Sequence, residues 1–395
     1  MQLAKGKGDV MLKKINSVMI LSMALSITSG LLLCGCSGDG GTDNTSANND
    51  DTDTDTDIDI DTDTDTDTDT EETNTLTVPA TCEEKSVAFA PYSDLVSVSC
   101  ADGYLEVHSP TGLPDPAPEN SYQKSMVGIE QWIQRIAIPY DYPWRIPMEP
   151  TWVTPYEEAT SRGPIAFAVN GVPIFHYDKR PDVSTDPSLY DADSDTVKQG
   201  ELDQCGGHAG QGEDYHYHYA PICLLDKHDL TQPIAYGMDG VPIYYGTGGT
   251  DYFGSGNFND IDNLPAGDLD SCNALLLEDG SYVYYTTAEP PYTIGCHHAH
   301  VDLDLRIEPR PLIGRDQGST SPSGGIVGEA VSTLVTDFYI DDENKYHFEH
   351  NSLSGDGTSA VIYHQVEVEG SSDCWEFEFR EDADTADSVE TYCRN

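Results

Sequence analysis

The side chains best suited to chemistry in this sequence are histidines clustered after Cys205. The chain reads Cys205-Gly-Gly-His208, followed by Tyr215-His-Tyr-His-Tyr219. Because alternate residues of a β-strand face the same side, His216 and His218 can present two imidazoles to one ion. His208 lies on the preceding Gly-rich loop and can supply a third. Three imidazoles with an open coordination position suit copper or zinc, so the sequence predicts a site for one of these ions.

Carboxylates near the cluster could orient the rings by accepting hydrogen bonds from them. The candidates for this role are Asp203, Glu213 and Asp214. The competing interpretation is structural: alternating Tyr and His side chains can pack across strands with their imidazoles hydrogen-bonded to carboxylates or carbonyls. The remaining histidines are weaker metal candidates. They are His176 beside a predicted hairpin, His347, His350 and His364 in a separate C-terminal segment, and His108 and His228, which we expect at the surface or in turns.

The sequence around the histidines occurs twice. Pro164–Ile174 recurs as Pro233–Ile243 at an offset of 69 residues, and Leu202–Cys205 recurs as Leu269–Cys272 at an offset of 67. In both copies a Tyr-x-Tyr segment begins ten residues after the cysteine. Residues 163–231 and 232–300 are therefore interpreted as two copies of one unit.

The second copy lacks the histidines of the first. Leu275, Val283 and Tyr285 stand at the corresponding positions. If the three histidines bind one ion together, they should be lost together. Sequence drift in a strand that only needs aromatic residues would give the same result. Copy two ends instead in Cys296-His-His-Ala-His300, where His298 and His300 have strand spacing. We expect this pair to complete the first site or to form a second one.

The local patterns predict a mainly β fold. Each copy should open with a hairpin whose turn is Asn170-Gly171 or Asp239-Gly240, since these dipeptides favour positive φ. Pro173 and Pro242 follow these turns, and a proline there must lie on an edge strand or at the start of a strand. Alternating apolar and aromatic residues predict further strands at Ser86–Ala90, Val96–Ser99, Tyr104–His108, Tyr215–Tyr219, Tyr282–Thr286, Ala360–Val368 and Cys374–Arg380. Only Ser125–Ile138 is a helix candidate.

Eight cysteines remain when Cys34 and Cys36 are set aside. An even number in an exported protein indicates disulfides. Each loop would contribute about 3 kcal/mol in the chain-entropy model. The spacing falls into neighbouring pairs, which predicts Cys82 with Cys100, Cys205 with Cys223, Cys272 with Cys296, and Cys374 with Cys393. Thiol catalysis is not expected.

The N-terminus is expected to be an export signal. Lysines precede an apolar stretch that ends in Leu33-Cys-Gly-Cys36, a tetrad that resembles a bacterial lipobox. Residues 1–35 would be a lipoprotein signal peptide, and Cys36 would carry the lipid that anchors the protein to a membrane, with Ser37 favouring the outer membrane or cell surface. The alternative is an ordinary cleaved signal with two incidental cysteines.

Charge and composition suggest how the rest of the chain is organised. Residues 36–75 form an acidic Asp/Thr-rich segment that we expect to be a disordered stalk. The formal net charge of -51 excludes nucleic-acid binding, which depends on cations at the phosphate backbone. No later apolar run has membrane-spanning length. We expect a β domain at 76–312, a Gly/Ser linker at 313–328 and a small β segment at 329–395.

Several of these motifs together resemble the YHYH domain family of exported proteins. They are the Tyr215-His-Tyr-His218 tetrad, Cys205-Gly-Gly-His208, Pro221-Ile-Cys223, the two Gly-Val turns, Leu269–Cys272 and Pro291–Cys296. The resemblance covers roughly residues 95–310 and implies a conserved module without implying a reaction. Where relatives often repeat the tetrad, this chain has Tyr282-Val-Tyr-Tyr285. That departure counts against a second, symmetric metal site.

Three functions fit these observations. The first is a surface lipoprotein that binds copper or zinc. The second is a non-enzymatic module that binds glycan or protein through Tyr215, Tyr217, Tyr219, Tyr244, Tyr245 and Tyr284. The third is a metal-dependent enzyme with the same three histidines and a nearby carboxylate as base. No hydrolase motif or phosphate-binding loop is present, and nothing fixes a substrate.

Overall fold

The computed structural model divides the chain into two units, residues 1–71 and 72–395. All the residues that the structure describes belong to the second unit. They are 78–114, 137–159, 163–178, 190–199, 201–202, 205–210, 213–248, 262–310, 312, 335–351, 357–380 and 386–394. The predicted signal peptide, Cys36, the stalk, the 313–328 linker and all but two residues of the 125–138 helix candidate lie outside these ranges.

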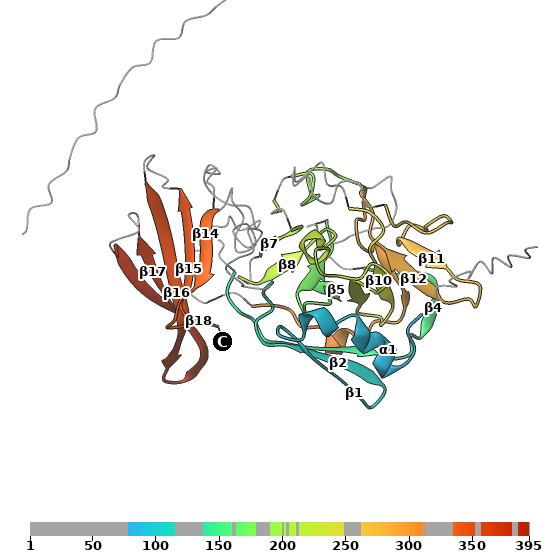
Figure 1. Ribbon diagram of the computed structural model, residues 1–395, viewed down its shortest axis with the longest axis horizontal. Coiled ribbons are helices and arrows are strands. Elements are labelled where there is room, and N and C mark those ends of the chain that lie inside the picture. Colours follow the sequence, from blue (N-terminus) through green and yellow to red (C-terminus); the bar gives the residue numbers. More distant parts are fainter. Residues whose placement is uncertain are drawn as a thin grey trace, which may run out of the picture. The chain divides into compact units, whose positions relative to one another are not determined.

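The described part is mainly β, as predicted, with one short α-helix (Figure 1). None of its helices has the length and apolar character needed to cross a bilayer. The elements are α1 (Cys82–Val87), η1 (Ala90–Tyr92), β1 (Ser97–Ala101), β2 (Tyr104–Ser109), β3 (Tyr142–Pro147), β4 (Trp152–Glu158), β5 (Pro164–Ala168), β6 (Pro173–Phe175), β7 (Gly207–Ala209), β8 (Tyr215–Tyr217), η3 (Ile222–Leu224), β9 (Ala235–Gly237), β10 (Pro242–Tyr244), β11 (Ala274–Leu276), β12 (Tyr282–Tyr285), β13 (Cys296–Ala299), η4 (Leu303–Leu305), β14 (Val335–Ile340), β15 (Tyr346–Asn351), β16 (Thr358–Val368), β17 (Ser371–Arg380) and β18 (Ser388–Arg394).

One strand prediction is wrong. Residues 86–90 lie at the end of α1 and in the turn after it, not in a strand. Thr81 caps this helix by accepting from the Glu84 backbone N–H, and the Glu84 carboxylate accepts from the Thr81 backbone N–H. This reciprocal capping box fixes a helix start at Cys82. Its Thr-x-x-Glu pattern is visible in the sequence and outweighs the short apolar alternation that follows.

The duplication is visible in the central eight-stranded sheet, whose order is β11-β12-β10-β9-β5-β6-β8-β7. Each copy contributes four strands, and the second half runs through its equivalents of the first half in mirror order. The halves meet where β5 pairs antiparallel with β9. At that join Phe167 faces Tyr236, its equivalent at the 69-residue offset. The sheet therefore has approximate two-fold symmetry.

The pairing of residues across strands shows the same equivalence between the two copies at the histidine positions. His208 faces His216 across β7 and β8, and Leu275 faces Val283 across β11 and β12. Pro173 and Pro242 each begin a strand, one of the two places the sequence allowed. The repeat alignment made from the sequence thus matches the pairing of the strands.

Both predicted hairpin turns form, with positive φ confined to their glycines. Gly171 and Gly240 each have φ of +84°. A Cβ would lie 2.5 Å from Ser109 Cβ at the first turn and 2.4 Å from the Pro147 carbonyl oxygen at the second, so glycine is required on both counts. Asn170 and Asp239 use side-chain oxygens to accept from the backbone two residues on.

The two turns are capped by different side chains from outside the repeats. The indole of Trp144 donates to the Gly171 carbonyl at 2.8 Å, whereas the Lys85 ammonium donates to the Gly240 carbonyl at 3.0 Å. Lys85 is fully buried, and burial lowers its pKa to about 8, although the Asp239 carboxylate opposes that shift. A buried cation therefore accompanies the turn that carries a buried carboxylate.

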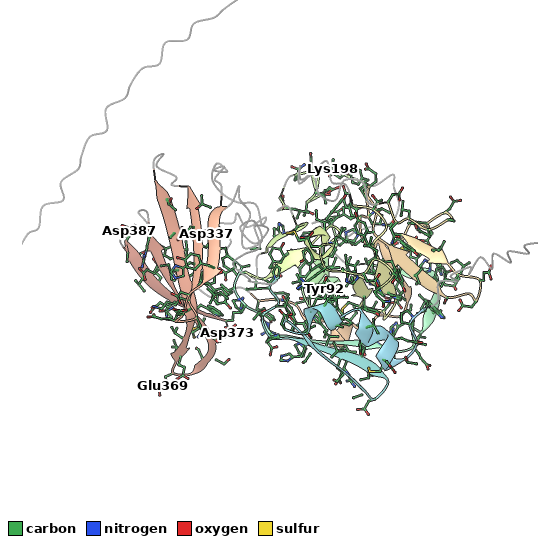
Figure 2. The ribbon with its side chains drawn as sticks, in the orientation of Figure 1. Tyr92, Lys198, Asp337, Glu369, Asp373 and Asp387 are labelled. Carbon is green, nitrogen blue, oxygen red and sulfur yellow. A yellow bond between two sulfur atoms is a disulfide. The ribbon has the colours of Figure 1, made fainter. Side chains whose placement is uncertain are left out.

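Three smaller sheets complete the described fold. They are β1-β2-β3, the pair β13-β4, and a five-stranded antiparallel meander, β14 to β18 in sequence order. Large aromatic side chains fill the interior of the domain; Tyr92, marked in Figure 2, is one that is fully buried. All four predicted disulfides are present, namely Cys82–Cys100, Cys205–Cys223, Cys272–Cys296 and Cys374–Cys393.

Candidate metal centre

The three predicted histidines of copy one meet at a point. The Nε2 atom of His216 lies 3.1 Å from that of His208 and 3.0 Å from that of His218, and the last two are 3.1 Å apart. The centre of this triangle is about 1.8 Å from each nitrogen, close to the usual metal–nitrogen distance of about 2.0–2.1 Å, so the three residues could hold a transition-metal ion. We call these three residues the His triad.

The opposite nitrogen of each ring is held by an acceptor. His208 Nδ1 lies 3.1 Å from the Glu201 carbonyl oxygen, and His218 Nδ1 lies 2.7 Å from the His176 carbonyl oxygen. His216 Nδ1 lies 2.8 Å from the Asp214 carboxylate. Because these oxygens only accept, each Nδ1 carries the proton and donates it. With each Nδ1 bonded to its acceptor, the Nε2 atom of every ring faces the shared point.

The His triad is buried and closely packed. The three histidines are only 4–5% exposed. Phe175 stacks on the His216 ring at 4.1 Å between centroids, and a Cβ on Gly210 would lie 2.4 Å from the Cε1 atom of the same ring. The strand pairing of β7 with β8 positions His208 and His216, and His218 follows directly after β8.

Of the three predicted ring-orienting carboxylates, Asp214 takes that role. It is buried at 2% exposure and bonded to His216. Glu213 is also buried but accepts from the Leu312 backbone N–H. Asp203 lies outside the described residues. The other two rings are oriented by backbone carbonyls of Glu201 and His176, which side-chain patterns could not reveal.

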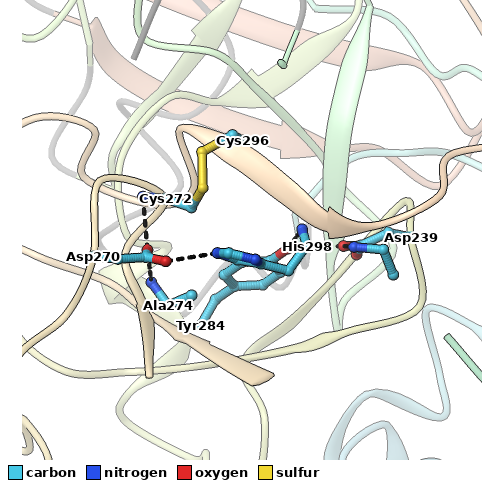
Figure 3. Close-up of polar contacts among 8 residues, drawn as sticks. Asp239, Asp270, Cys272, Ala274, Tyr284, Cys296 and His298 are labelled. Carbon is cyan, nitrogen blue, oxygen red and sulfur yellow. Dashed lines mark hydrogen bonds and ion pairs between the residues drawn. A yellow bond between two sulfur atoms is a disulfide. The ribbon is translucent and has the colours of Figure 1, made fainter. Parts of the chain in front are cut away.

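The two histidines predicted in copy two are not brought to the His triad or to each other. His298 Nε2 bonds to Asp270 at 2.6 Å (Figure 3), whereas His300 Nδ1 bonds to Glu157 at 2.8 Å on the surface. Cys272 lies near His298 and Asp270, but its sulfur is committed to the disulfide with Cys296. This environment therefore lacks the three convergent imidazoles of copy one.

The hydrogen bonds of these two pairs shift the pKa of at least one partner in each. Burial raises the pKa of Asp270, but hydrogen bonds from His298, Ala274 and Cys272 outweigh it and lower the pKa overall. The hydrogen bond to Glu157 raises the pKa of His300. Each of these two histidines therefore has a carboxylate partner.

The other histidines have partners outside the His triad where they are described. His176 is buried and its Nδ1 accepts from the Asp178 backbone, so it contributes a carbonyl rather than an imidazole to the His triad. The side chain of His350 lies outside the described residues. The remaining partners are Asp141 for His108, the Gln232 carbonyl for His228, Asp341 for His347 and Glu376 for His364.

The six tyrosines predicted to offer exposed aromatic faces are instead buried. Each is 4% exposed or less. Tyr217 receives a hydrogen bond from the Asn170 amide, and Tyr284 donates to Asp239 at the equivalent place in copy two. Alternation along a strand does not show whether other elements cover the face on which a ring lies. The aromatic-surface hypothesis therefore loses the residues on which it was based.

At the equivalent position of copy two the structure has an apolar cluster. Tyr244, Val283 and Tyr285 are buried together, and Leu275 packs against them. Tyr244 corresponds to Phe175 by sequence offset and lies 5.8 Å from Tyr285 between ring centroids. The fold therefore builds the same four-strand unit with or without a polar cluster.

Comparison with known proteins supports the resemblance over this region. A family model described as YHYH protein matches residues 143–256. This stretch is shorter than the 95–310 expected from motifs, but it contains the whole His triad and the first copy. No curated protein and no solved structure matches the chain.

Proposed function

We propose that the YHYH domain of this chain binds one transition-metal ion through Nε2 of His208, His216 and His218. The observation that carries the proposal is the convergence of three Nε2 atoms within 3.1 Å while all three Nδ1 atoms donate elsewhere. Three imidazole nitrogens face one another in a buried space. A cation satisfies all of them at once.

Negative charge near the site, and on the chain as a whole, favours a cation. Asp214 is the carboxylate bonded to a ring of the His triad, so it compensates part of the charge of a bound ion. It also makes His216 a stronger donor, as carboxylates behind metal-bound histidines do. The large negative charge of the chain attracts cations from solution as well.

Copper is preferred to zinc as the occupant. Imidazole nitrogens bind both ions, and the general affinity order places Cu²⁺ above Zn²⁺ for such donors. Three ligands leave a position open for water or a substrate, as in catalytic rather than structural sites. Capture of copper at the cell exterior is the simplest function that uses these features.

The site would operate outside the cytoplasm. The Leu33-Cys-Gly-Cys36 tetrad supports a lipid anchor at Cys36 and an acidic stalk that extends from the membrane. Four disulfides in the folded part fit an oxidising compartment. Labelling with a radioactive fatty acid, lost in Cys36→Ser, tests the anchor independently of the metal.

Elemental analysis of the purified full chain tests metal binding. The wild-type protein should contain about one copper or zinc ion per chain, and His216→Ala with His218→Ala should remove it. His298→Ala is the matched control, because it truncates a buried histidine of copy two that lies outside the His triad. Metal that persists in the double variant, or that is lost in the control alone, would contradict the assignment.

A further inference from the structure

The three Nε2 atoms of the His triad form a nearly regular triangle. Their separations are 3.0, 3.1 and 3.1 Å, and the rings are inclined to one another by 74° to 88°. Among the described residues, the candidate ligand group at this point consists of these three histidines and includes no carboxylate or thiol. The His triad therefore offers one ion a trigonal set of nitrogen donors.

A phenyl ring packs against two members of the His triad. Phe175, at the end of β6, stacks on the His216 ring with centroids 4.1 Å apart and planes inclined by 14°. The same ring meets the His218 ring edge-on at 6.3 Å. Phe175 is partly exposed, whereas the three histidines are 4–5% exposed. Phe175 is therefore an apolar wall of the site that reaches the surface, and it offers no oxygen to an ion.

The charge in contact with the His triad matches a monovalent ion. Imidazoles that bind a metal are neutral. Asp214, only 2% exposed, is bonded to His216, whereas the Nδ1 atoms of the other two rings face the carbonyl oxygens of Glu201 and His176. One carboxylate balances Cu(I). A divalent ion would leave a positive charge in a buried place, which costs desolvation free energy.

The coordination preferences of the candidate ions favour the same one. Cu(II) prefers a tetragonal arrangement of N and O ligands, and Zn(II) takes a fourth ligand in a tetrahedral site. Both ions therefore need water or another oxygen donor in addition to the His triad. Cu(I) has a filled d shell and is satisfied by three nitrogen donors. Phe175 excludes water from the side of the His216 ring that it covers, so it disfavours the additional ligands.

We propose that the His triad selects Cu(I) over Cu(II) and Zn(II), and that Phe175 is a specificity-determining residue of this site. The inference rests on the proposed function and names the oxidation state of the ion that the site takes. Phe175 does not bind the ion. Its ring packs on His216 and His218 and raises the cost of adding the oxygen ligands that divalent ions require.

Copy two supplies a matched control for Phe175. Tyr244 has the equivalent position and stacks on Tyr285, the equivalent of His218, at 5.8 Å between centroids. Tyr244 belongs to the apolar cluster of copy two. Truncation of Tyr244 therefore removes an aromatic ring from the same place in the repeat, in the copy that lacks the three histidines.

Competition titrations of the purified full chain test the selectivity. Cu(I) affinity is measured against bicinchoninate without oxygen, and Cu(II) affinity against nitrilotriacetate. We expect the wild type to bind Cu(I) at least about 100-fold more tightly than Cu(II), because the divalent ion keeps an unbalanced buried charge. An excess of Zn(II) should not displace Cu(I).

Variants of Phe175 test its role. Phe175→Ala should lower the ratio of Cu(I) to Cu(II) affinity about tenfold, which lowers the reduction potential of the bound copper by about 59 mV for this one-electron couple. Phe175→Gln, which fills more of the space but brings an amide oxygen, should lower the ratio as well and serves if the alanine variant does not fold. Phe175→Leu, which stays apolar, and Tyr244→Ala should keep the wild-type ratio.

The outcomes separate this inference from the proposed function. A wild-type chain that binds Cu(II) or Zn(II) through the His triad as tightly as Cu(I) would overturn the selectivity while the metal site stands. A chain that binds none of these ions would overturn both proposals. An unchanged ratio in folded Phe175→Ala or Phe175→Gln, or an equal fall in Tyr244→Ala, would refute the role of Phe175.

Discussion

The two halves of the eight-stranded sheet share strand order and register but differ in what they bury. In copy one the facing residues His208 and His216 belong to a polar cluster, whereas their equivalents Leu275 and Val283 are apolar and pack with Tyr244 and Tyr285. Buried imidazoles cost desolvation that an apolar cluster does not. The scaffold therefore does not need the histidines, which indicates that copy one keeps them for their chemistry.

The turns of the two halves differ in the opposite sense, because the half with the polar cluster has the uncharged turn. Asn170 in copy one is neutral and its turn is capped by the neutral indole of Trp144. Asp239 in copy two is fully buried, burial raises its pKa, and its turn is capped by the Lys85 ammonium. Buried charge in copy two is therefore carried by Asp239 with Lys85 at the same turn, and in copy one by Asp214, which is bonded to His216.

The largest effect should come from breaking the charged turn. Asp239→Ala removes the acceptor used by Tyr284 and by the Val241 and Ala299 backbone groups, and it leaves Lys85 buried without its carboxylate. We expect a loss of about 3–5 kcal/mol in the free energy of unfolding, measured by urea titration. Asn170→Ala should cost about 1–3 kcal/mol, because it removes neutral hydrogen bonds only. Equal losses would show that the two turns are energetically alike.

A swap of copy-two residues into copy one tests whether the His triad is retained at a cost. His208→Leu, His216→Val and His218→Tyr together should abolish metal binding. In metal-free buffer the swap should be neutral or stabilise the fold by about 1–4 kcal/mol, as when buried polar groups become well-packed apolar ones. Calorimetry with a chelator present measures this. A strongly destabilised swap would mean that the histidines serve packing.

A smaller effect is expected from the charge behind the His triad. Asp214→Asn keeps the shape of the side chain but removes the carboxylate that accepts from His216. We expect the metal dissociation constant to rise about 10- to 100-fold, in line with substitutions behind metal ligands elsewhere. Competition with a chromophoric chelator measures it. Asp270→Asn, the matched change at the His298 pair of copy two, should leave the affinity unchanged.

The smallest effect is a pH dependence specific to copy two. The pKa of Lys85 is lowered to about 8 in the folded state, so between about pH 8 and 10 the unfolded chain binds more protons than the folded chain. The free energy of unfolding should therefore rise with pH in this window, by up to about 1 kcal/mol per unit, and level off below it. Lys85→Met should remove the slope. A slope that persists in Lys85→Met would assign it to other groups.

Local features of the fold were predictable from sequence. The hairpins and their glycines follow from the turn dipeptides, and disulfide pairing follows from cysteine spacing. The His triad was predictable because its members are close in sequence and strand alternation brings two of them together. The helix α1 was missed although its capping box, Thr81 and Glu84, is written in the sequence.

Features that depend on distant or backbone groups could not be predicted. The Glu201 and His176 carbonyls that fix two rings have no side-chain signature. The pairing of His298 with Asp270 joins residues 28 positions apart. The burial of the Tyr215–Tyr219 rings depends on which elements cover the sheet, and period-two alternation alone cannot show that.

X-ray absorption spectroscopy of the copper- or zinc-loaded full chain tests the central claim most directly. The account predicts one ion per chain with three imidazole nitrogens at about 2.0 Å, and their loss in the three-residue swap. An ion surrounded only by oxygen or sulfur, or an unchanged spectrum in the swap, would contradict the assignment of His208, His216 and His218 as its ligands.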